Sequence, residues 1–290
     1  MDVSVIIITY NTLNLTIDCI NSVFEKTSGL KFEVILVDNA SCDGSKEYFS
    51  IKEEIIYVYN EKNLGFGAAN NIGAKVASGK YLFLLNSDTV LLENSIKIFY
   101  DYMENTPNVS ACGGNLVDAN YENVPICGHF PTLINDFFLI GFYKFFRSWY
   151  KQKISVSQDL SCLRTFDVDY ISGADIFIKH EVFSQLKGFD QDFFMYYEET
   201  DLFKRMSKAG LKSVIIPHTA IVHLVGGSSS NQLSLNKYRM IHNSKLLYYK
   251  KHHASVLVLF VKLFDFLGIA VRPHYYKNVY LKFLKESLKG

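Results

Sequence analysis

Short apolar runs alternate with segments of helical spacing over the first 105 residues, and this alternation restricts the fold more than any other feature. The opening run, Val3–Thr9, is almost wholly apolar, as expected for a strand buried on both faces of a sheet. Further strands are predicted at 33–37, 55–59 and 81–85, and helices at 13–26, from 45, at 66–78 and at 93–105. The pattern predicts an α/β chain with a doubly wound, mostly parallel sheet.

The second half of the chain is less regular. Residues 115–166 include an aromatic stretch, 137–149. Two short strands are predicted within 167–179, then a helix at 199–209, a strand at 213–216, a loop at 217–234 and a helix at 235–252. We expect a domain over 1–234, with a nucleotide-binding half (1–114) and an acceptor and catalytic half (115–234), followed by a helical tail, 235–290.

The tail differs from the body in charge and hydropathy. The whole chain has a formal net charge of +1, but residues 237–290 carry +9 and residues 1–236 carry −8. Residues 255–271 are apolar but include Lys262 and Asp265, so an interfacial helix is favoured over a membrane span. A basic, aromatic tail favours peripheral contact with an anionic membrane; a solvated helical tail is the alternative. No nucleic-acid partner is expected.

The cysteines and the N-terminus bear on the compartment. The five cysteines include no CxxC pair and their number is odd, which argues against a disulfide framework or a zinc site. The first residues are typical of a strand and not of a signal peptide. We therefore expect a cytoplasmic protein, which lies at the inner face of the cell membrane if the tail binds lipid.

Polar residues follow the predicted strands, at the sheet edge where such folds bind ligands. Asp88, in Asn86-Ser87-Asp88, either binds a divalent cation that bridges a diphosphate or caps the next helix. Asp38 either accepts the imide N–H of a pyrimidine ring or shapes a structural turn. The glycine-rich segment 63–73 resembles a phosphate loop that opens a helix, but it lacks both the dinucleotide-fold spacing and a P-loop Gly-Lys-Ser/Thr.

The second half supplies candidate catalytic groups. Glu198, Glu199 and Asp201 begin a helix, where acids favour the helix dipole or act as a general base toward an acceptor hydroxyl. The aromatic residues before them are either a sugar-stacking wall or core (Phe193, Phe194, Tyr196, Tyr197). His223 is either a structural histidine or a second metal ligand.

Together these segments resemble family 2 glycosyltransferases of the GT-A fold. The matches are the Thr-Tyr-Asn end of the first strand, 37–45, 63–73, Asn86-Ser87-Asp88, the acidic segment 188–201 and His223-x-x-Gly226, and they cover about residues 3–230. The subgroup most alike contains bacterial rhamnosyltransferase-like enzymes that build surface polysaccharides on lipid-linked acceptors.

The resemblance implies a role for each matching residue. Asp88 and His223 would bind Mg²⁺ or Mn²⁺, and Glu199 or Glu198 would be the base. Glu199 stands where the family usually has an Asp, which leaves the base assignment open. Asn86 replaces the first Asp of the family's DXD motif. The donor, a UDP- or dTDP-sugar, would contact nine residues: Thr9, Tyr10, Asn11, Asp38, Asn63, Gly65, Asn70, Asn86 and Ser87.

The implied reaction transfers a sugar, with inversion, to a hydroxyl of a glycan or polyprenyl-linked acceptor. Three alternatives stand beside it. A non-catalytic nucleotide-sugar-binding protein would not need the acid cluster. A nucleotidyltransferase would carry a glycine-rich basic signature after the first strand, and none follows Val3–Thr9. A processive synthase would carry Gln-x-x-Arg-Trp, which is absent because the sole Trp, Trp149, follows Arg147-Ser148.

Overall fold

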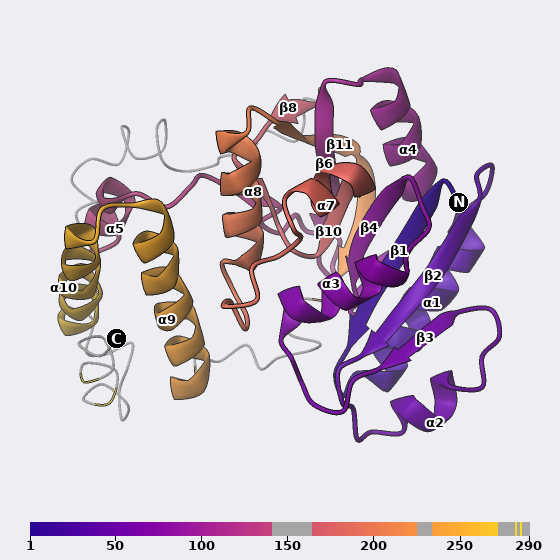
Figure 1. The fold of residues 1–290 in the computed structure, drawn as a ribbon, viewed down its shortest axis with the longest axis horizontal. Helices are drawn as coiled ribbons and strands as arrows, with labels where there is room; N and C mark the ends of the chain where they lie inside the picture. The colour runs from indigo at the N-terminus through magenta and orange to yellow at the C-terminus, as the bar shows by residue number, and fades with distance from the viewer. Residues whose placement is uncertain (141–163, 225–233, 272–281, 283–284, 286–290) are drawn as a thin grey trace.

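The computed structural model describes residues 1–140, 164–224, 234–271, 282 and 285, and within them a mixed central sheet is flanked by helices (Figure 1). The order of its strands is β3-β2-β1-β4-β10-β6-β11-β5, with β8 also paired to β11. The strands are β1 (Val3–Thr9), β2 (Phe32–Asp38), β3 (Ile56–Tyr59), β4 (Tyr81–Asn86), β5 (Thr89–Leu91), β6 (Val109–Val117), β8 (Phe166–Asp167), β10 (Asp175–Lys179) and β11 (Lys212–His223). A separate two-stranded ladder joins β7 (Cys127–Gly128) to β9 (Tyr170–Ile171).

The N-terminal strands form the parallel part that the sequence predicts. β1 pairs with β2 and β4, and β2 pairs with β3, all in parallel. Their apolar side chains are buried and build the main core. Helices connect the strands: α1 (Leu13–Lys26), α2 (Ser45–Phe49), α3 (Phe66–Val76) and α4 (Ser95–Asn105). The carboxyl ends of β1, β2 and β4 therefore meet at one edge, which prepares a ligand site there.

Two features of the sheet differ from the sequence-based expectation. β10 is inserted antiparallel between β4 and β6, so the sheet is mixed beyond β4. The loop predicted at 217–234 is wrong for its first part, because β11 continues to His223. A register shift between Ile216 and Ala220 accommodates Pro217, which has no N–H to donate to a ladder. Residues 225–233 lie outside the described part.

The C-terminal segment packs against the rest of the molecule. α9 (Leu235–His252) and α10 (Val256–Ala270) contact each other, and α10 contacts α5 (Leu133–Leu139). A second core gathers Leu246, Tyr248, Tyr249 and Val261 with Phe193 from the preceding region. In Figure 1, α5, α9 and α10 stand together at the side of the sheet nearest α8 (Glu198–Lys208).

Buried charges inside this helical group pair with one another. Lys245 lies 2.7 Å from Asp136 of α5 and 2.8 Å from Asp265 of α10, while His242 lies 2.7 Å from Asp265. Although burial opposes it, these two carboxylates raise the pKa of Lys245. The apolar segment carrying Asp265 is thus a docked helix, and no helix of the described residues is long and apolar enough to cross a membrane. Residues 141–149 of the aromatic stretch lie outside the description.

Candidate active site

The carboxyl end of β2 presents Asp38, which is fully buried and held from two sides. Its Oδ1 accepts a hydrogen bond from the backbone N–H of Ser41 (2.8 Å), and its Oδ2 accepts one from the Tyr57 hydroxyl (2.7 Å). Burial and this contact with Asp38 raise the pKa of Tyr57 well above its usual value, so the hydroxyl stays a donor. Because the carboxylate is closed off from solvent, the predicted pyrimidine contact requires one of these partners to give way.

The loop after β1 is tied to the loop after β2. Asn11 has a left-handed backbone (φ 55°), its N–H donates to Ser41 Oγ (3.0 Å), and its Oδ1 accepts from the backbone N–H of Cys42 (2.8 Å). Tyr10 is 48% exposed beside it. Thr9 is fully buried, with its hydroxyl 2.9 Å from that of Thr16. Tyr10 and Asn11 therefore face solvent as a donor site requires, whereas the Thr9 side chain supports the loop from the core.

A single buried amide organises the glycine-rich segment. Asn39 Nδ2 donates to Asn63 Oδ1 (3.0 Å) and to the carbonyl of Gly65 (3.3 Å), and its Oδ1 accepts from the backbone N–H of Leu64 (3.1 Å). Gly65 has φ 85°, and a Cβ there would lie 2.1 Å from the carbonyl oxygen of Phe194. Asn70 is buried and donates to the Phe66 carbonyl. This segment is therefore fixed on one side by β2 and on the other by residue 194.

The end of β4 brings the two predicted metal ligands together. Asp88 is 3% exposed, and its Oδ1 lies 3.3 Å from Nε2 of His223. Antiparallel pairing of β5 with β11 sets Thr89 opposite His223, and the Leu224 N–H donates to the Asp88 carbonyl. Ser87 Oγ lies 3.2 Å from Thr12 Oγ1, which ties this turn to α1. The long strand β11 thus delivers an imidazole to a carboxylate 135 positions earlier in the chain.

This pair has the donor chemistry of a divalent-cation site. A carboxylate oxygen suits Mg²⁺ or Mn²⁺, and an imidazole nitrogen suits the softer of the two. Across the described ranges, no group of three or more His, Cys, Asp and Glu side chains is placed to enclose a metal ion. Two protein ligands leave room for substrate oxygens, so the residues present fit a cation shared with a diphosphate.

The three acids at the start of α8 lie in two different environments. Burial, reinforced by the charge of Glu199, raises the pKa of Glu198 well above its usual value, and burial raises the pKa of Glu199 as well. Glu198 is 5% exposed, and its Oε2 has no hydrogen-bond partner among the described residues. Tyr196 and Tyr197, which precede the pair, both have positive φ (69° and 68°), a strained entry of the kind that clusters at functional sites.

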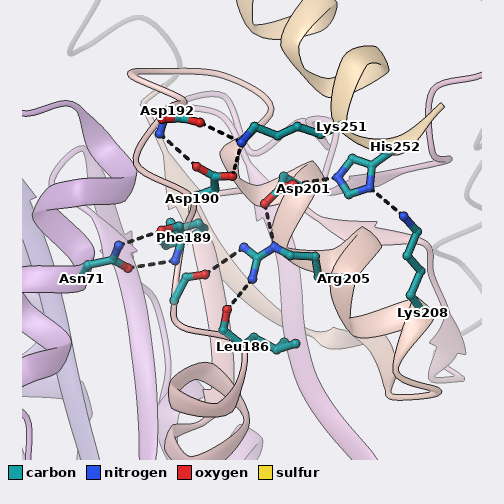
Figure 2. Close-up of polar contacts among 11 residues, drawn as sticks. Asn71, Leu186, Phe189, Asp190, Asp192, Asp201, Arg205, Lys208, Lys251 and His252 are labelled. Atoms are coloured by element: carbon teal, nitrogen blue, oxygen red, sulfur yellow. Dashed lines mark hydrogen bonds and ion pairs between the residues drawn. The ribbon is translucent and has the colours of Figure 1, made fainter. Parts of the chain in front are cut away.

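Asp201 is engaged in structural contacts instead. Its Oδ2 accepts from Nε of Arg205 (2.8 Å) and its Oδ1 pairs with Nε2 of His252 (2.7 Å), as Figure 2 shows. Although burial opposes it, His252 and Arg205 hold the pKa of Asp201 below its usual value. Arg205 also donates to the carbonyls of Leu186 and Gly188. Asp201 therefore connects α8 to α9 through His252 and, through Arg205, to residues 186–188. Because both of its carboxylate oxygens are engaged, Asp201 is not available as a base.

Two parts of the chain lie between the donor side and the acids: α3, which touches Glu198, and β9 with the residues after it, against which α8 packs. The backbone N–H of Asn86 donates to the Ala174 carbonyl (3.0 Å), just after β9. Tyr170 of β9 responds to the acid pair: burial and then the charge of Glu199 raise its pKa to about 12. A Cβ on Gly67 would lie 3.5 Å from Cβ of Glu198. The acid pair thus lies against α3 on one side and β9 on the other.

Comparison with known proteins assigns the chain to a family. Residues 4–159, more than half of the chain, match the family model described as glycosyl transferase family 2. The chain belongs to this family. A solved structure of Staphylococcus aureus TarS (residues 1–349) in complex with UDP-GlcNAc superposes with a TM-score of 0.61, covering 99% of this chain and 80% of the other at 16% identity. At that identity the likeness shows the fold alone, and it confirms the predicted GT-A class.

Sequence relatives of this family 2 glycosyltransferase differ in how much of each chain the similarity covers. An uncharacterized glycosyltransferase of Rickettsia felis is 40% identical over 104 residues, which is 35% of this chain and 17% of that protein. The N-acetylglucosaminyl-diphospho-decaprenol L-rhamnosyltransferase of Mycobacterium tuberculosis is 26% identical, covering 66% of both chains. The poly(ribitol-phosphate) beta-glucosyltransferase of Bacillus spizizenii is 28% identical over 43% of this chain and 20% of the other.

The sequence alone did not indicate several residues that hold the site in place, namely Asn39, Tyr57, Arg205 and His252. Asn39 follows the strand predicted at 33–37, and the Asn-rich composition of 60–71 is the signal that could have indicated its role. Tyr57 gave no signal beyond strand alternation. Arg205 follows Asp201 by one helical turn, but His252 lies 51 residues after it, and nothing in the local sequence links 201 to 252. The residues that hold the site together are thus mostly those whose partners lie far away in the chain.

Proposed function

We propose that this family 2 glycosyltransferase is an inverting enzyme that transfers a sugar from a UDP- or dTDP-sugar to an acceptor hydroxyl with the help of Mg²⁺ or Mn²⁺. One observation carries the proposal: Asp88 and His223 lie 3.3 Å apart just after β4, and Glu198 packs against Gly67 of α3, the helix that leads into β4. A displacement at an anomeric carbon requires positive charge near the leaving diphosphate and a base near the acceptor hydroxyl.

Asp88 and His223 would hold the cation together with oxygens of the donor diphosphate. When bound, the cation supplies positive charge that stabilises the leaving diphosphate. The chain's own part is to fix the two ligand atoms: β4 and β5 present Asp88, and β11 presents His223. Asn86 and Ser87 are bound to Ala174 and Thr12, so the turn is held in place before the donor arrives.

Glu199 is the better placed of the two acids to act as base. It is only partly buried, whereas Glu198 is 5% exposed and packs against Gly67. In the reaction, the acceptor oxygen forms a bond to the anomeric carbon and its proton passes to Glu199. The bond from that carbon to the diphosphate breaks, and its electron pair leaves with the diphosphate. Glu198 is 5% exposed and its Oε2 has no hydrogen-bond partner among the described residues, so in this proposal Glu198 keeps its proton and Glu199 carries the single charge.

The acceptor class follows from the relatives' names. One acts on an N-acetylglucosaminyl-diphospho-decaprenol and another on poly(ribitol-phosphate), so a phosphorylated glycan or polyprenyl-linked acceptor is proposed here. The proposed donor is a UDP- or a dTDP-sugar, since a buried carboxylate at position 38 could read either pyrimidine.

Peripheral membrane contact at the inner face of the cell membrane is part of the proposal. α10 exposes an apolar stripe whose spacing places it on one helical face: Val256 (56% exposed), Leu259 (66%), Phe260 (45%), Leu263 (47%) and Leu267 (37%). Such a helix lies in a lipid interface when basic residues accompany it, and residues 237–290 carry a net +9. Flotation with anionic vesicles tests this contact: Leu259→Glu should abolish it.

The decisive experiment measures donor turnover. Purified protein is screened with UDP- and dTDP-sugars for release of the nucleoside diphosphate, with and without EDTA and added Mn²⁺. Asp88→Asn should abolish the metal-dependent release, whereas Asp18→Asn, an exposed acid on α1, should leave it unchanged. Binding of nucleotide sugars without any turnover, in the presence of metal and of phosphorylated glycan acceptors, would instead support a non-catalytic binding protein.

A further inference from the structure

A groove of about 540 Å³ lies between α9 and the segment that leads into the acid pair. One wall is the segment 192–195, and the other is a face of α9. The groove is lined by Asp192, Phe194, Met195, Asn236, Arg239, Met240, Asn243, Ser244 and Leu247. Three positions on the helical wall, 236, 240 and 243, are three or four residues apart and so share one side of the helix. Other residues of α9, among them Tyr248 and Tyr249, are buried in the second core.

We propose that this groove is the acceptor site and binds a sugar or polyol joined to a phosphate. The proposal rests on the glycosyltransferase function proposed above and adds which residues recognise the acceptor. It places substrate recognition on α9, in the segment that the sequence marked as a membrane-associated tail.

The position of the groove joins it to both halves of the reaction. Phe194, on its wall, accepts a hydrogen bond through its carbonyl from the Phe66 N–H (3.1 Å) and touches the position of Gly65 on the donor loop. Four residues further along the same segment, Glu198 begins the acid pair. An acceptor held against Phe194 therefore lies next to the donor loop and close in the chain to the proposed base.

The chemistry of the lining suits a phosphorylated glycan. Phe194 exposes 45% of its surface, and an exposed aromatic face is a platform for the C–H face of a sugar ring. The amides of Asn236 and Asn243 offer donors and acceptors for hydroxyl groups. Arg239 offers a planar, charged fork that matches phosphate oxygens. Met195, Met240 and Leu247 add an apolar floor.

Contacts between the two walls hold the groove in shape. Ser244 Oγ donates to the Met195 carbonyl (2.8 Å), and Lys251 lies 2.8 Å from Asp192 and 2.7 Å from Asp190. Figure 2 shows Lys251 reaching from α9 to both acids. Lys251 also neutralises Asp192, the one acid in the lining, so the groove does not repel an anion. A preformed site loses less entropy when it binds a ligand.

The test uses two probes that share this chemistry but come from different sources: N-acetylglucosaminyl-diphospho-farnesol and a short ribitol-phosphate oligomer. Equilibrium binding of each is measured by calorimetry on the full chain, and transfer to each is measured with the donor that the turnover screen selects. We expect Phe194→Ala and Arg239→Ala each to weaken acceptor binding and to raise the acceptor KM about tenfold or more. Donor hydrolysis without acceptor and the donor KM should not change. Arg239→Lys should restore part of the binding.

Matched controls are available in the helical region. Phe260 of α10 is exposed to the same 45% as Phe194, and Lys250 is an exposed cation on α9 outside the groove lining. Phe260→Ala and Lys250→Ala should leave both acceptor measurements unchanged with these short-chain probes. The probe that binds more tightly identifies the source of the acceptor. The inference is overturned if wild-type protein binds neither probe, or if it binds and the groove variants bind equally well. Loss of donor hydrolysis in wild-type protein would instead contradict the proposed function, while the binding measurement still decides on the groove.

Discussion

The donor side and the acid-bearing side of this glycosyltransferase are built in different ways. On the donor side, Asp38, Asn39 and Asp88 follow strands, and their partners are nearby loops of the same half of the chain or the adjacent β11. On the acid-bearing side, α8 is held by charges from α9, about fifty residues later. The first arrangement depends on sheet geometry, and the second depends on tertiary ion pairs.

This difference has a consequence for sensitivity to mutation. A loop that is held by several neutral hydrogen bonds loses little stabilising free energy when one of them is removed. A buried charge that loses its partner is left unpaired in a poorly solvating environment, which costs far more. We therefore expect donor-side support variants to change KM modestly, and α8–α9 variants to change stability. The predictions below test this contrast, starting with the largest effect.

Glu199→Gln should reduce kcat by about 10³-fold, because the amide accepts no proton and general-base catalysis contributes on this scale. Acceptor and donor KM should change little. Because burial raises the pKa of Glu199, wild-type kcat should fall as the pH drops through a value above that of an ordinary glutamate. Steady-state kinetics from pH 5 to 9 measure both effects. An equal loss in Glu198→Gln with an unchanged Glu199→Gln would assign the base to Glu198.

Asp201→Asn should lower the free energy of unfolding by about 3 kcal/mol, because it leaves the half-buried Arg205 and the buried His252 side chain without their carboxylate. The side chain of Asp201 is 2% exposed and that of His252 5%. Asp101→Asn is the matched control, since Lys97–Asp101 has the same i,i+4 spacing but is exposed, and an exposed pair contributes at most about 0.5 kcal/mol. Urea unfolding measures both.

The same pair predicts a pH dependence of stability. The pKa of Asp201 is lowered in the folded state, so its contribution is complete above the ordinary Asp pKa and is lost as the pH falls through the lowered value. The acid limb of the stability curve should therefore flatten in Asp201→Asn. An acid limb that matches the wild type would show that other carboxylates govern it.

Gly65→Ala should lower the unfolding free energy by about 2 kcal/mol more than Gly210→Ala, since both have positive φ but only the first places a Cβ against backbone. A Cβ at 65 would lie 2.1 Å from the Phe194 carbonyl oxygen, whereas nothing lies within 4 Å of one at 210. Because residue 65 is where the two sides of the site touch, the variant should also raise the KM of both substrates. Equal unfolding free energies of the two variants would mean that the backbone at residues 65 and 194 moves apart at little cost.

Ser41→Ala should have the smallest effect, raising the donor KM about fivefold with kcat unchanged, because one neutral hydrogen bond to the Asn11 N–H is lost. Ser50→Ala, at an exposed serine on the same stretch of chain, serves as the control. A change in kcat larger than the change in KM would place Ser41 in the chemistry and not in loop support.

Local patterns account for what the sequence predicts well. β1 and α9 have the predicted bounds. The bounds of β2, β3, β4 and α3 differ from the predicted ones by one or two residues at one or both ends. The agreement is this close because apolar runs and glycine signals are local features of the sequence. The antiparallel β10 could not be foreseen, since its pairing with β4 joins distant segments. Pro217 was interpreted as the start of a loop, but a register shift lets β11 pass it.

The site was predictable to the same extent. Asp88 and His223 were paired by resemblance, and the structure places their side chains 3.3 Å apart. Their assignment to a metal stays a prediction, as do the donor contacts and the domain boundary at 234. The role of Asp201 was missed, because an acid at a helix start has the same local signature whether it is a base or half of a buried pair.

The Asp201–His252 and Lys251–Asp190 contacts limit how such enzymes can be recombined. An exchange of C-terminal helices between family members, made to give one enzyme the specificity of another, would leave the buried Asp201 and the partly exposed Asp190 without partners unless the incoming helix brought a histidine and a lysine at matching positions. Chimeras joined before residue 186 would inherit α8 and its partners as one unit and avoid that conflict.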